Sequence, residues 1–234
     1  MLNYLRKRGF GFLLVTNTSR MSQSQIRDKL TDLGYQIDLK EIFPVSLAAV
    51  EYLSSRFGHA RCFLIGDPSL EMLLTDSGHS VVRHETSVDA VVMGQCMWPD
   101  FGEIDIARRL INDGAEPIAL HRDPTWPDGN VTRIGLGPMV AALELVISQP
   151  VTLIGKPERA FFDAALARTG FERSQTVMIG DSLSSDIAGG INAGLKSLLV
   201  RTGNSISEPI PPGCDGELPS IADLPQWCDA QLDC

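Results

Sequence analysis

The sequence has no long hydrophobic run and no paired cysteine motif. Its first apolar run, Phe10 to Val15, is too short for the core of a signal peptide and far below the ~20 residues of a membrane span. The five cysteines include no C-x-x-C pair, and an odd count without a signal peptide predicts reduced thiols, with no disulfide framework and no zinc site. We therefore expect a cytoplasmic protein with no membrane partner.

Positive charge is also scarce. The 234 residues contain 20 Lys and Arg against 29 Asp and Glu, a formal net charge of −9, and no Lys or Arg occurs from Asn204 onward. This sign is wrong for nonspecific binding of nucleic acid or anionic lipid, so we expect no nucleic-acid partner. A ligand that carries phosphate would need a local cluster of positive groups.

What the sequence does contain is an alternation of strand-like and helical patterns, which predicts an α/β fold with a parallel sheet and helices on its faces. The run 12–15 is followed by a capping box, Ser22-x-x-Gln25, that opens a helix. Residues 121–138 are expected to form a long loop, and the last 31 residues a tail on the surface. The later strand-like runs are 62–65, 88–93, 118–120, 151–154, 176–179 and 197–200.

Two carboxylates follow the run 176–179. Asp181 comes directly after Gly180, at the carboxyl end of the predicted strand, where open α/β sheets bind their ligands. Asp186 falls in the first turn of the next helix and can point back to the same place. Such a pair suits Mg²⁺, which takes oxygen ligands and accepts one or two carboxylates together with phosphate. The structural alternative is that Asp181 caps the turn and Asp186 complements the helix dipole.

Two further segments with polar groups follow predicted strands. Lys156 stands in the segment Gly-Lys-Pro, and we expect Pro157 to open the helix that follows. From there Lys156 can reach a phosphate at the sheet edge, or it can be an ordinary surface lysine. The stretch Thr16-Asn17-Thr18 offers neutral hydroxyl and amide donors to phosphoryl oxygens, although such residues also serve as caps. The three segments together are much more specific than any one of them.

In this order, the three segments resemble motifs two, three and four of the haloacid dehalogenase-like phosphohydrolases, and the long insertion between the second and third resembles the NagD-like, type IIA branch. The stretches 41–46, 63–67, 122–129 and 137–144 also resemble that branch. The resemblance implies a Rossmann-like parallel sheet core with an inserted α/β cap of the C2 type. On that pattern we expect core segments at 1–59 and 149–234 and a cap domain at 60–148.

The resemblance also implies roles for individual residues. Thr16 would bind the transferring phosphoryl group and Lys156 would neutralise it, while Asn17 and Thr18 belong to the same substrate-binding loop. Asp181 would ligate Mg²⁺ and Asp186 would hold the water shell of the metal. Trp126, in the loop 123–129, is a candidate for substrate specificity or simply an anchor for that loop. The expected substrate is a small phosphorylated metabolite, and exposed cap surfaces could support a homodimer.

The sequence departs from the family pattern in one respect. Family members begin with a strand that ends in D-x-D-G, whose first Asp attacks phosphorus, and no D-x-D-G occurs in these 234 residues. We expect an incomplete N-terminus, from a misplaced start or a gene fragment, and a chain that is inactive as it stands. The alternative is a catalytically dead phosphate-binding or scaffold protein. An in-frame D-x-D-G upstream of Met1 would favour the first hypothesis, and an immediate stop codon the second.

Overall fold

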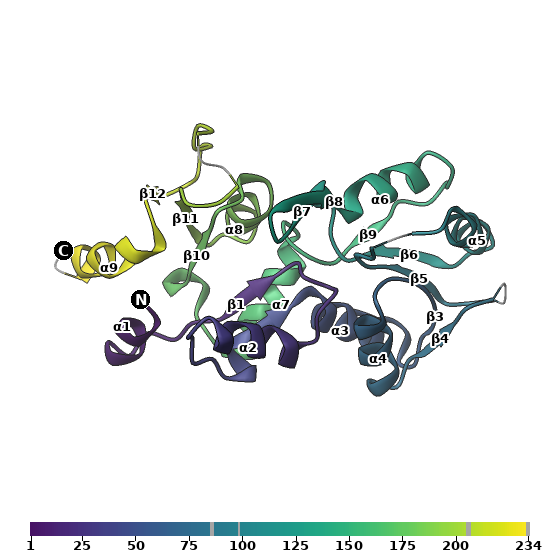
Figure 1. The fold of residues 1–234 in the computed structure, drawn as a ribbon, viewed down its shortest axis with the longest axis horizontal. Coiled ribbons are helices and arrows are strands. Elements are labelled where there is room, and N and C mark those ends of the chain that lie inside the picture. The colour runs from purple at the N-terminus through teal and green to yellow at the C-terminus, as the bar shows by residue number, and fades with distance from the viewer. Residues whose placement is uncertain (85–86, 98, 205–206, 233–234) are drawn as a thin grey trace. The chain divides into compact units, whose positions relative to one another are not determined.

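A computed structural model describes nearly the whole chain and shows a mixed α/β protein built on parallel sheets (Figure 1). The described residues are 1–84, 87–97, 99–204 and 207–232. Among them, no helix is long and apolar enough to cross a membrane. The α/β class expected from the alternating pattern is confirmed.

The chain divides into two compact units. The central unit is Leu14–Gly155, and the terminal unit combines Met1–Leu13 with Lys156–Cys234. Each unit has its own parallel sheet. These limits differ from the predicted segments 1–59, 60–148 and 149–234, which remain a prediction about core and cap.

The central unit contains a five-stranded parallel sheet in the order β4-β3-β5-β6-β9. Its inner strands are almost wholly apolar and buried, as expected for strands covered on both faces. The register pairs Leu64 with Val92 and Val92 with Ile118. The strands are β3 (Arg61–Ile65), β4 (Ser80–Val82), β5 (Ala90–Met93), β6 (Glu116–Ala119) and β9 (Thr152–Leu153).

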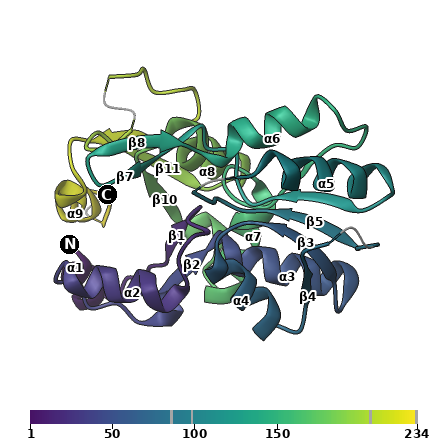
Figure 2. The same cartoon turned by 45° about the vertical axis from the view of Figure 1, so that its right-hand side comes forward.

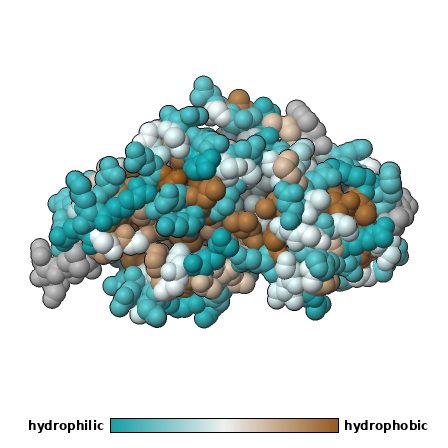
Figure 3. Space-filling model, turned by 90° about the horizontal axis from the view of Figure 1, so that it is seen from below, coloured by the Kyte–Doolittle hydropathy of each residue, from teal (hydrophilic) through white to brown (hydrophobic). Residues whose placement is uncertain are grey.

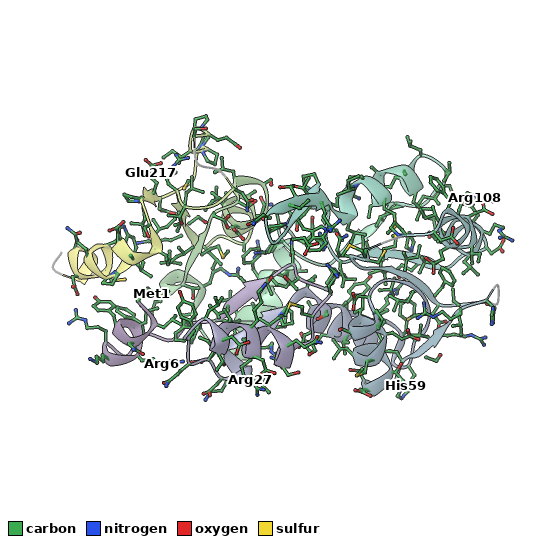
Figure 4. All side chains as sticks on the ribbon, viewed as in Figure 1. Met1, Arg6, Arg27, His59, Arg108 and Glu217 are labelled. Atoms are coloured by element: carbon green, nitrogen blue, oxygen red, sulfur yellow. The ribbon has the colours of Figure 1, made fainter. Side chains whose placement is uncertain are left out.

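Helices cover both faces of this sheet, with α3 and α4 on one face and α5 and α6 on the other (Figures 1 and 2). Strands that run parallel need crossover connections, and helices α4 and α5 provide two of them. Arg108, on α5, is half-buried and pairs with Asp105 (Figure 4). The four helices are α3 (Val45–Phe57), α4 (Pro68–Asp76), α5 (Phe101–Asn112) and α6 (Leu136–Glu144).

A second parallel pair in the central unit joins β1 (Leu14–Thr16) to β2 (Ile42–Pro44). Helix α2 (Gln23–Asp32) connects them and begins at the predicted capping box, in which the Ser22 hydroxyl accepts from the Gln25 amide at 3.2 Å. The strand β2 and the edge strand β4, each three residues long, are not among the strands that the sequence predicts.

The prediction that residues 121–138 form only a long loop is wrong. This segment contains an antiparallel hairpin of β7 (Thr125–Asp128) and β8 (Val131–Ile134). The two residues that join the strands are Gly129 and Asn130, and Gly129 has a φ of +62°. A Gly-Asn pair between two short strands is a recognised hairpin signal, but the prolines around it obscured the pattern.

The terminal unit is organised around a three-stranded parallel sheet in the order β10-β11-β12. Its strands are β10 (Val177–Gly180), β11 (Lys196–Val200) and β12 (Gly216–Leu218). Its helices are α1 (Leu2–Lys7), α7 (Arg159–Thr169), α8 (Ala188–Asn192) and α9 (Leu224–Leu232). Helix α7 begins two residues after Pro157, so that proline lies before the helix and does not open it as predicted.

The expectation of a surface tail over the last 31 residues is also wrong. The strand β12 continues the sheet, and Leu218 and Leu224 are buried together with Leu5 and Leu198. Helix α9 is tied to α1, because Tyr4 donates to the Asp229 carboxylate at 2.6 Å. Residues of α1, β12 and α9 therefore complete the core of the terminal unit. On the surface, polar residues dominate the face seen in Figure 3, with apolar patches between them.

A buried histidine makes the central unit sensitive to pH. His79 is 3% exposed; its Nδ1 accepts from the Ala60 amide at 3.1 Å, and its Nε2 lies 3.2 Å from the Ser54 hydroxyl. Burial lowers the pKa of His79 from its ordinary value of 6.5, and the nearby His59 acts in the same direction. The folded protein therefore keeps this imidazole neutral at a pH where the unfolded chain binds a proton.

We predict that the free energy of unfolding is highest above pH 6.5 and falls as the pH drops below it, because the unfolded state then binds the proton first. For one group the slope cannot exceed about 1.4 kcal/mol per pH unit. Urea unfolding at pH 7.5 and 5.5 should show a smaller difference for His79→Gln than for the native chain. The exposed His59 provides the control, since His59→Gln should retain most of the slope; equal slopes in all three proteins would contradict the prediction.

Candidate functional site

The carboxyl end of β10 carries a tight turn built around Asp186. One oxygen of this carboxylate, Oδ2, accepts from the backbone amides of Asp181 and Ser182, each at 3.1 Å. The chain then enters a π-helical turn, Leu183–Ile187, that leads into α8. Gly180 is required here, because a Cβ at that position would overlap the Asp186 carboxylate. The turn thus sets Asp181 at the strand end, as the sequence predicted.

Asp186 is also half of a buried ion pair. Its Oδ1 lies 2.6 Å from the Nζ of Lys156, and the two side chains are 7% and 10% exposed. Lys156 is therefore not an ordinary surface lysine. The structure brings these two predicted residues into direct contact, although they are 30 positions apart in the sequence. A buried charge pair with further hydrogen bonds has a fixed geometry, which is what a site for a charged ligand requires.

The predicted substrate loop lies at the carboxyl end of β1, in the central unit. The Thr16 hydroxyl donates to the Thr18 hydroxyl at 3.0 Å and accepts from the Thr18 amide at 3.1 Å. Asn17 is buried and its Nδ2 donates to Asp123 at 3.1 Å, while Asp123 also lies 3.1 Å from the ring of His121. The loop is thereby joined to the segment that precedes the β7–β8 hairpin.

Trp126 lies on β7 and is half-buried. The Arg20 guanidinium carbon lies 4.5 Å from the centre of its ring, a cation–π distance, and Arg20 is also 3.5 Å from Asp67. This contact links the hairpin to the loop 16–20 within the central unit. It fits the anchoring interpretation of Trp126, and a role of Trp126 in specificity remains a prediction.

Several polar residues near these loops were not found by sequence reasoning. Gln95 follows β5, and its backbone amide donates to the buried Ser19 hydroxyl at 2.9 Å. In the described part of the chain, its Oε1 is buried with no hydrogen-bond partner. Asn204 follows β11 and donates to Asp181. No spacing rule identifies such residues, because each acquires its partner only through the tertiary fold.

The residues at the carboxyl end of β10 fit a divalent cation that has few protein ligands. Within the described ranges, no cluster of three or more His, Cys, Asp or Glu side chains could hold a metal. One carboxylate at a strand end is nevertheless compatible with Mg²⁺, which keeps several waters and binds through one or two carboxylates plus phosphate. Cys62 and Cys96 are poor alternative nucleophiles, because burial raises the pKa of Cys62 to about 12 and also raises that of Cys96.

We predict that Lys156 and Asp186 stabilise the folded state only when both are present. Removing one partner leaves a buried charge without its counterion, so Lys156→Met and Asp186→Asn should each lower the free energy of unfolding by about 3 kcal/mol, and the double variant by much less than the sum. Denaturant unfolding measures all three. The exposed Arg159 on α7 is the control, and Arg159→Met should cost at most about 0.5 kcal/mol. A loss for Lys156→Met no larger than the control would contradict this prediction.

Comparison with known proteins gives consistent matches along the chain. Residues 1–80 match the family model for haloacid dehalogenase-like hydrolases, and residues 153–216 match a HAD-hydrolase-like model. An acid sugar phosphatase from Staphylococcus epidermidis is 30% identical over 209 residues, which cover 89% of this chain and 80% of the relative.

Solved structures agree with these matches. The 4-nitrophenylphosphatase of Thermotoga maritima is 27% identical, with a TM-score of 0.87 over 96% of this chain and 87% of that chain. A nagD protein is 26% identical, with a TM-score of 0.88 over 97% of this chain and 88% of that chain. The chain therefore belongs to the haloacid dehalogenase-like hydrolases, in their NagD-like branch.

Proposed function

We propose that this protein belongs to a lineage of Mg²⁺-dependent phosphomonoester hydrolases and that its substrate is a small phosphorylated metabolite. The observation that supports this most is the turn at the end of β10, where Asp181 is set beside a buried pair of Lys156 and Asp186. A phosphoryl group needs positive charge and a cation, and here the contacts of Asp186 join a lysine to the turn that carries the Asp181 carboxylate.

In this proposal Asp181 ligates Mg²⁺, and Asp186 orients the water shell of the metal while it holds Lys156 in place. Mg²⁺ would neutralise charge on the phosphoryl oxygens. Lys156 would supply a second positive charge there. Both oxygens of Asp186 already accept hydrogen bonds, so its contribution is mainly to position other groups.

The family resemblance assigns the other predicted residues to the substrate. Thr16 would donate its hydroxyl to a phosphoryl oxygen, and Asn17 and Thr18 would shape the loop that surrounds it. Trp126 would contact the organic part of the substrate. Within the central unit, the bonds from Thr16 to Thr18 and from Asn17 to Asp123 support a fixed loop, and fixed donors are what binding an anion requires.

The relatives narrow the substrate class. Haloacid dehalogenase-like phosphatases use a divalent metal, and the matched relatives are named for sugar phosphate and nitrophenyl phosphate. We propose sugar phosphates as the substrate class to assay first, before nucleotides, glycerol phosphate and pyridoxal phosphate. A homodimer formed through exposed surfaces and a cytoplasmic location also belong to this proposal.

A second candidate function is phosphate binding without catalysis. It applies to these 234 residues taken by themselves, because no D-x-D-G occurs among them. In the family mechanism the first Asp of that motif forms the covalent phosphoenzyme, and neither Asp181 nor Asp186 can replace it if both serve the metal. These residues would then bind phosphate and Mg²⁺ with little turnover.

We predict that Lys156→Ala weakens binding of inorganic phosphate or vanadate more than Lys196→Ala does. Lys156 is buried beside Asp186, whereas Lys196 is exposed at the first residue of β11. Calorimetric titration of both variants in Mg²⁺ tests this, with circular dichroism to confirm folding at the working temperature. If the two variants lose binding free energy to within about 0.5 kcal/mol of each other, Lys156 binds the anion no better than an exposed lysine does. The assignment of Lys156 to the phosphoryl group is then wrong.

We also predict that the 234 residues alone hydrolyse p-nitrophenyl phosphate very slowly, and that joining a D-x-D-G strand from a matched relative ahead of Met1 restores Mg²⁺-dependent turnover. The reason is chemical, since this proposal assigns Asp181 and Asp186 to the metal and the three matched segments supply no further carboxylate for in-line attack on phosphorus. A D-x-D-G strand with its first Asp changed to Asn is the matched control and should stay inactive. A native chain as fast as the extended one, with Asp181→Asn abolishing that rate, would show that a different group performs the attack.

A further inference from the structure

The loop that follows β11 lies directly against Asp181. Gly203 approaches the carboxylate so closely that a Cβ at this position would overlap it. The next residue, Asn204, donates twice to the same oxygen: its backbone amide lies 2.8 Å from Oδ2 of Asp181, and its side-chain Nδ2 lies 2.7 Å from it. Two donors on one oxygen fix both the position and the plane of the carboxylate.

The other oxygen of Asp181 is in a different situation. Among the residues that the structure describes, none donates a hydrogen bond to Oδ1, and the backbone amide of Asp181 is bound separately by Asp186. The carboxylate therefore has one oxygen held by the protein and one oxygen left for a ligand. A hydrogen-bonded carboxylate with one uncommitted oxygen is the usual form of a metal ligand with a supporting residue behind it.

The loop is itself anchored on its far side. Arg201 forms an ion pair with Glu217 on β12, the residue labelled in Figure 4, and donates to the backbone carbonyl of Glu208 at 2.7 Å. The loop is thus attached to β12 at Arg201 and to β10 through Asn204. Residues 201–204 are therefore held at both ends, by the ion pair of Arg201 and by the bonds of Asn204 to Asp181, although the side chain of Asn204 is exposed.

We propose that Asn204 is a positioning residue that orients Asp181 for a divalent cation. The inference rests on the proposed function, which makes Asp181 the ligand. Asn204 holds Oδ2, so the carboxylate has already lost its rotational freedom and Oδ1 would be the oxygen left for the cation. Without the side chain of Asn204, the backbone amide alone holds Oδ2 and the carboxylate can rotate, which weakens binding of the cation.

The test is a calorimetric titration of Mg²⁺ into the native chain and three variants, well below the melting temperature of each. Supporting residues behind a metal ligand typically contribute 10- to 100-fold in affinity, and because the backbone donor remains we expect Asn204→Ala to bind about 10-fold more weakly. Asp181→Asn should abolish binding. Asn3→Ala, at an exposed asparagine on α1 in the same unit, is the matched control and should bind as the native chain does.

The outcomes separate this inference from the proposed function. If Asp181→Asn abolishes binding but Asn204→Ala stays within twofold of the native chain, the role of Asn204 is wrong and the metal site stands. If Asp181→Asn binds like the native chain, or the native chain binds no Mg²⁺, the metal assignment fails and the role of Asn204 fails with it.

An NMR measurement provides a readout that needs no Asn204 variant. The side-chain amide signals of Asn204 should shift when Mg²⁺ is added to the native chain and should not shift in Asp181→Asn. A residue that only stabilises the loop would show no such metal-dependent shift. Absence of the shift in a native chain that binds Mg²⁺ would overturn the inference.

Discussion

The contacts of Asp186 are the constraint on which the rest of the site depends. One of its oxygens holds the backbone of the turn after β10, and the other holds the buried ammonium of Lys156. Burying two charges is costly, and the cost is offset only when both are paired and further hydrogen bonds satisfy the carboxylate. The same turn sets Asp181 at the end of the strand, where its side chain accepts hydrogen bonds from Asn204. Asp186 alone thus positions the ammonium of Lys156, the turn after β10 and, through that turn, Asp181.

Much of the fold could be predicted from the sequence because its inner strands are apolar and its helices begin with clear caps. The run 62–65 became β3, and the capping box at Ser22 opens α2. The errors share a physical cause, since short strands gain their stability from neighbours that the sequence does not reveal. The hairpin at 125–134 and the strand β12 carry few apolar residues, and both exist because a partner strand pairs with them.

The candidate site could be predicted in part for a similar reason. Motif spacing singled out Lys156, Asp181 and Asp186 because each follows a strand, and the structure brings Lys156 and Asp186 together. Spacing could not identify Asn204 or the stacking of Arg20 on Trp126, since Asn204 and Arg20 lie in loops and their partners are distant in sequence. Residues that support a ligand are usually found only once the fold is known.

The central claim is that the strand-end turn of β10 binds a divalent cation through Asp181. The most direct measurement is a crystal structure of the protein grown with Mn²⁺ in place of Mg²⁺, with an anomalous difference map to locate the ion. The account predicts a strong peak directly coordinated by Oδ1 of Asp181, with Asn204 still bonded to Oδ2. An Mn²⁺ ion bound only elsewhere, for example among the acidic residues near Glu217, with no density at Asp181, would contradict it.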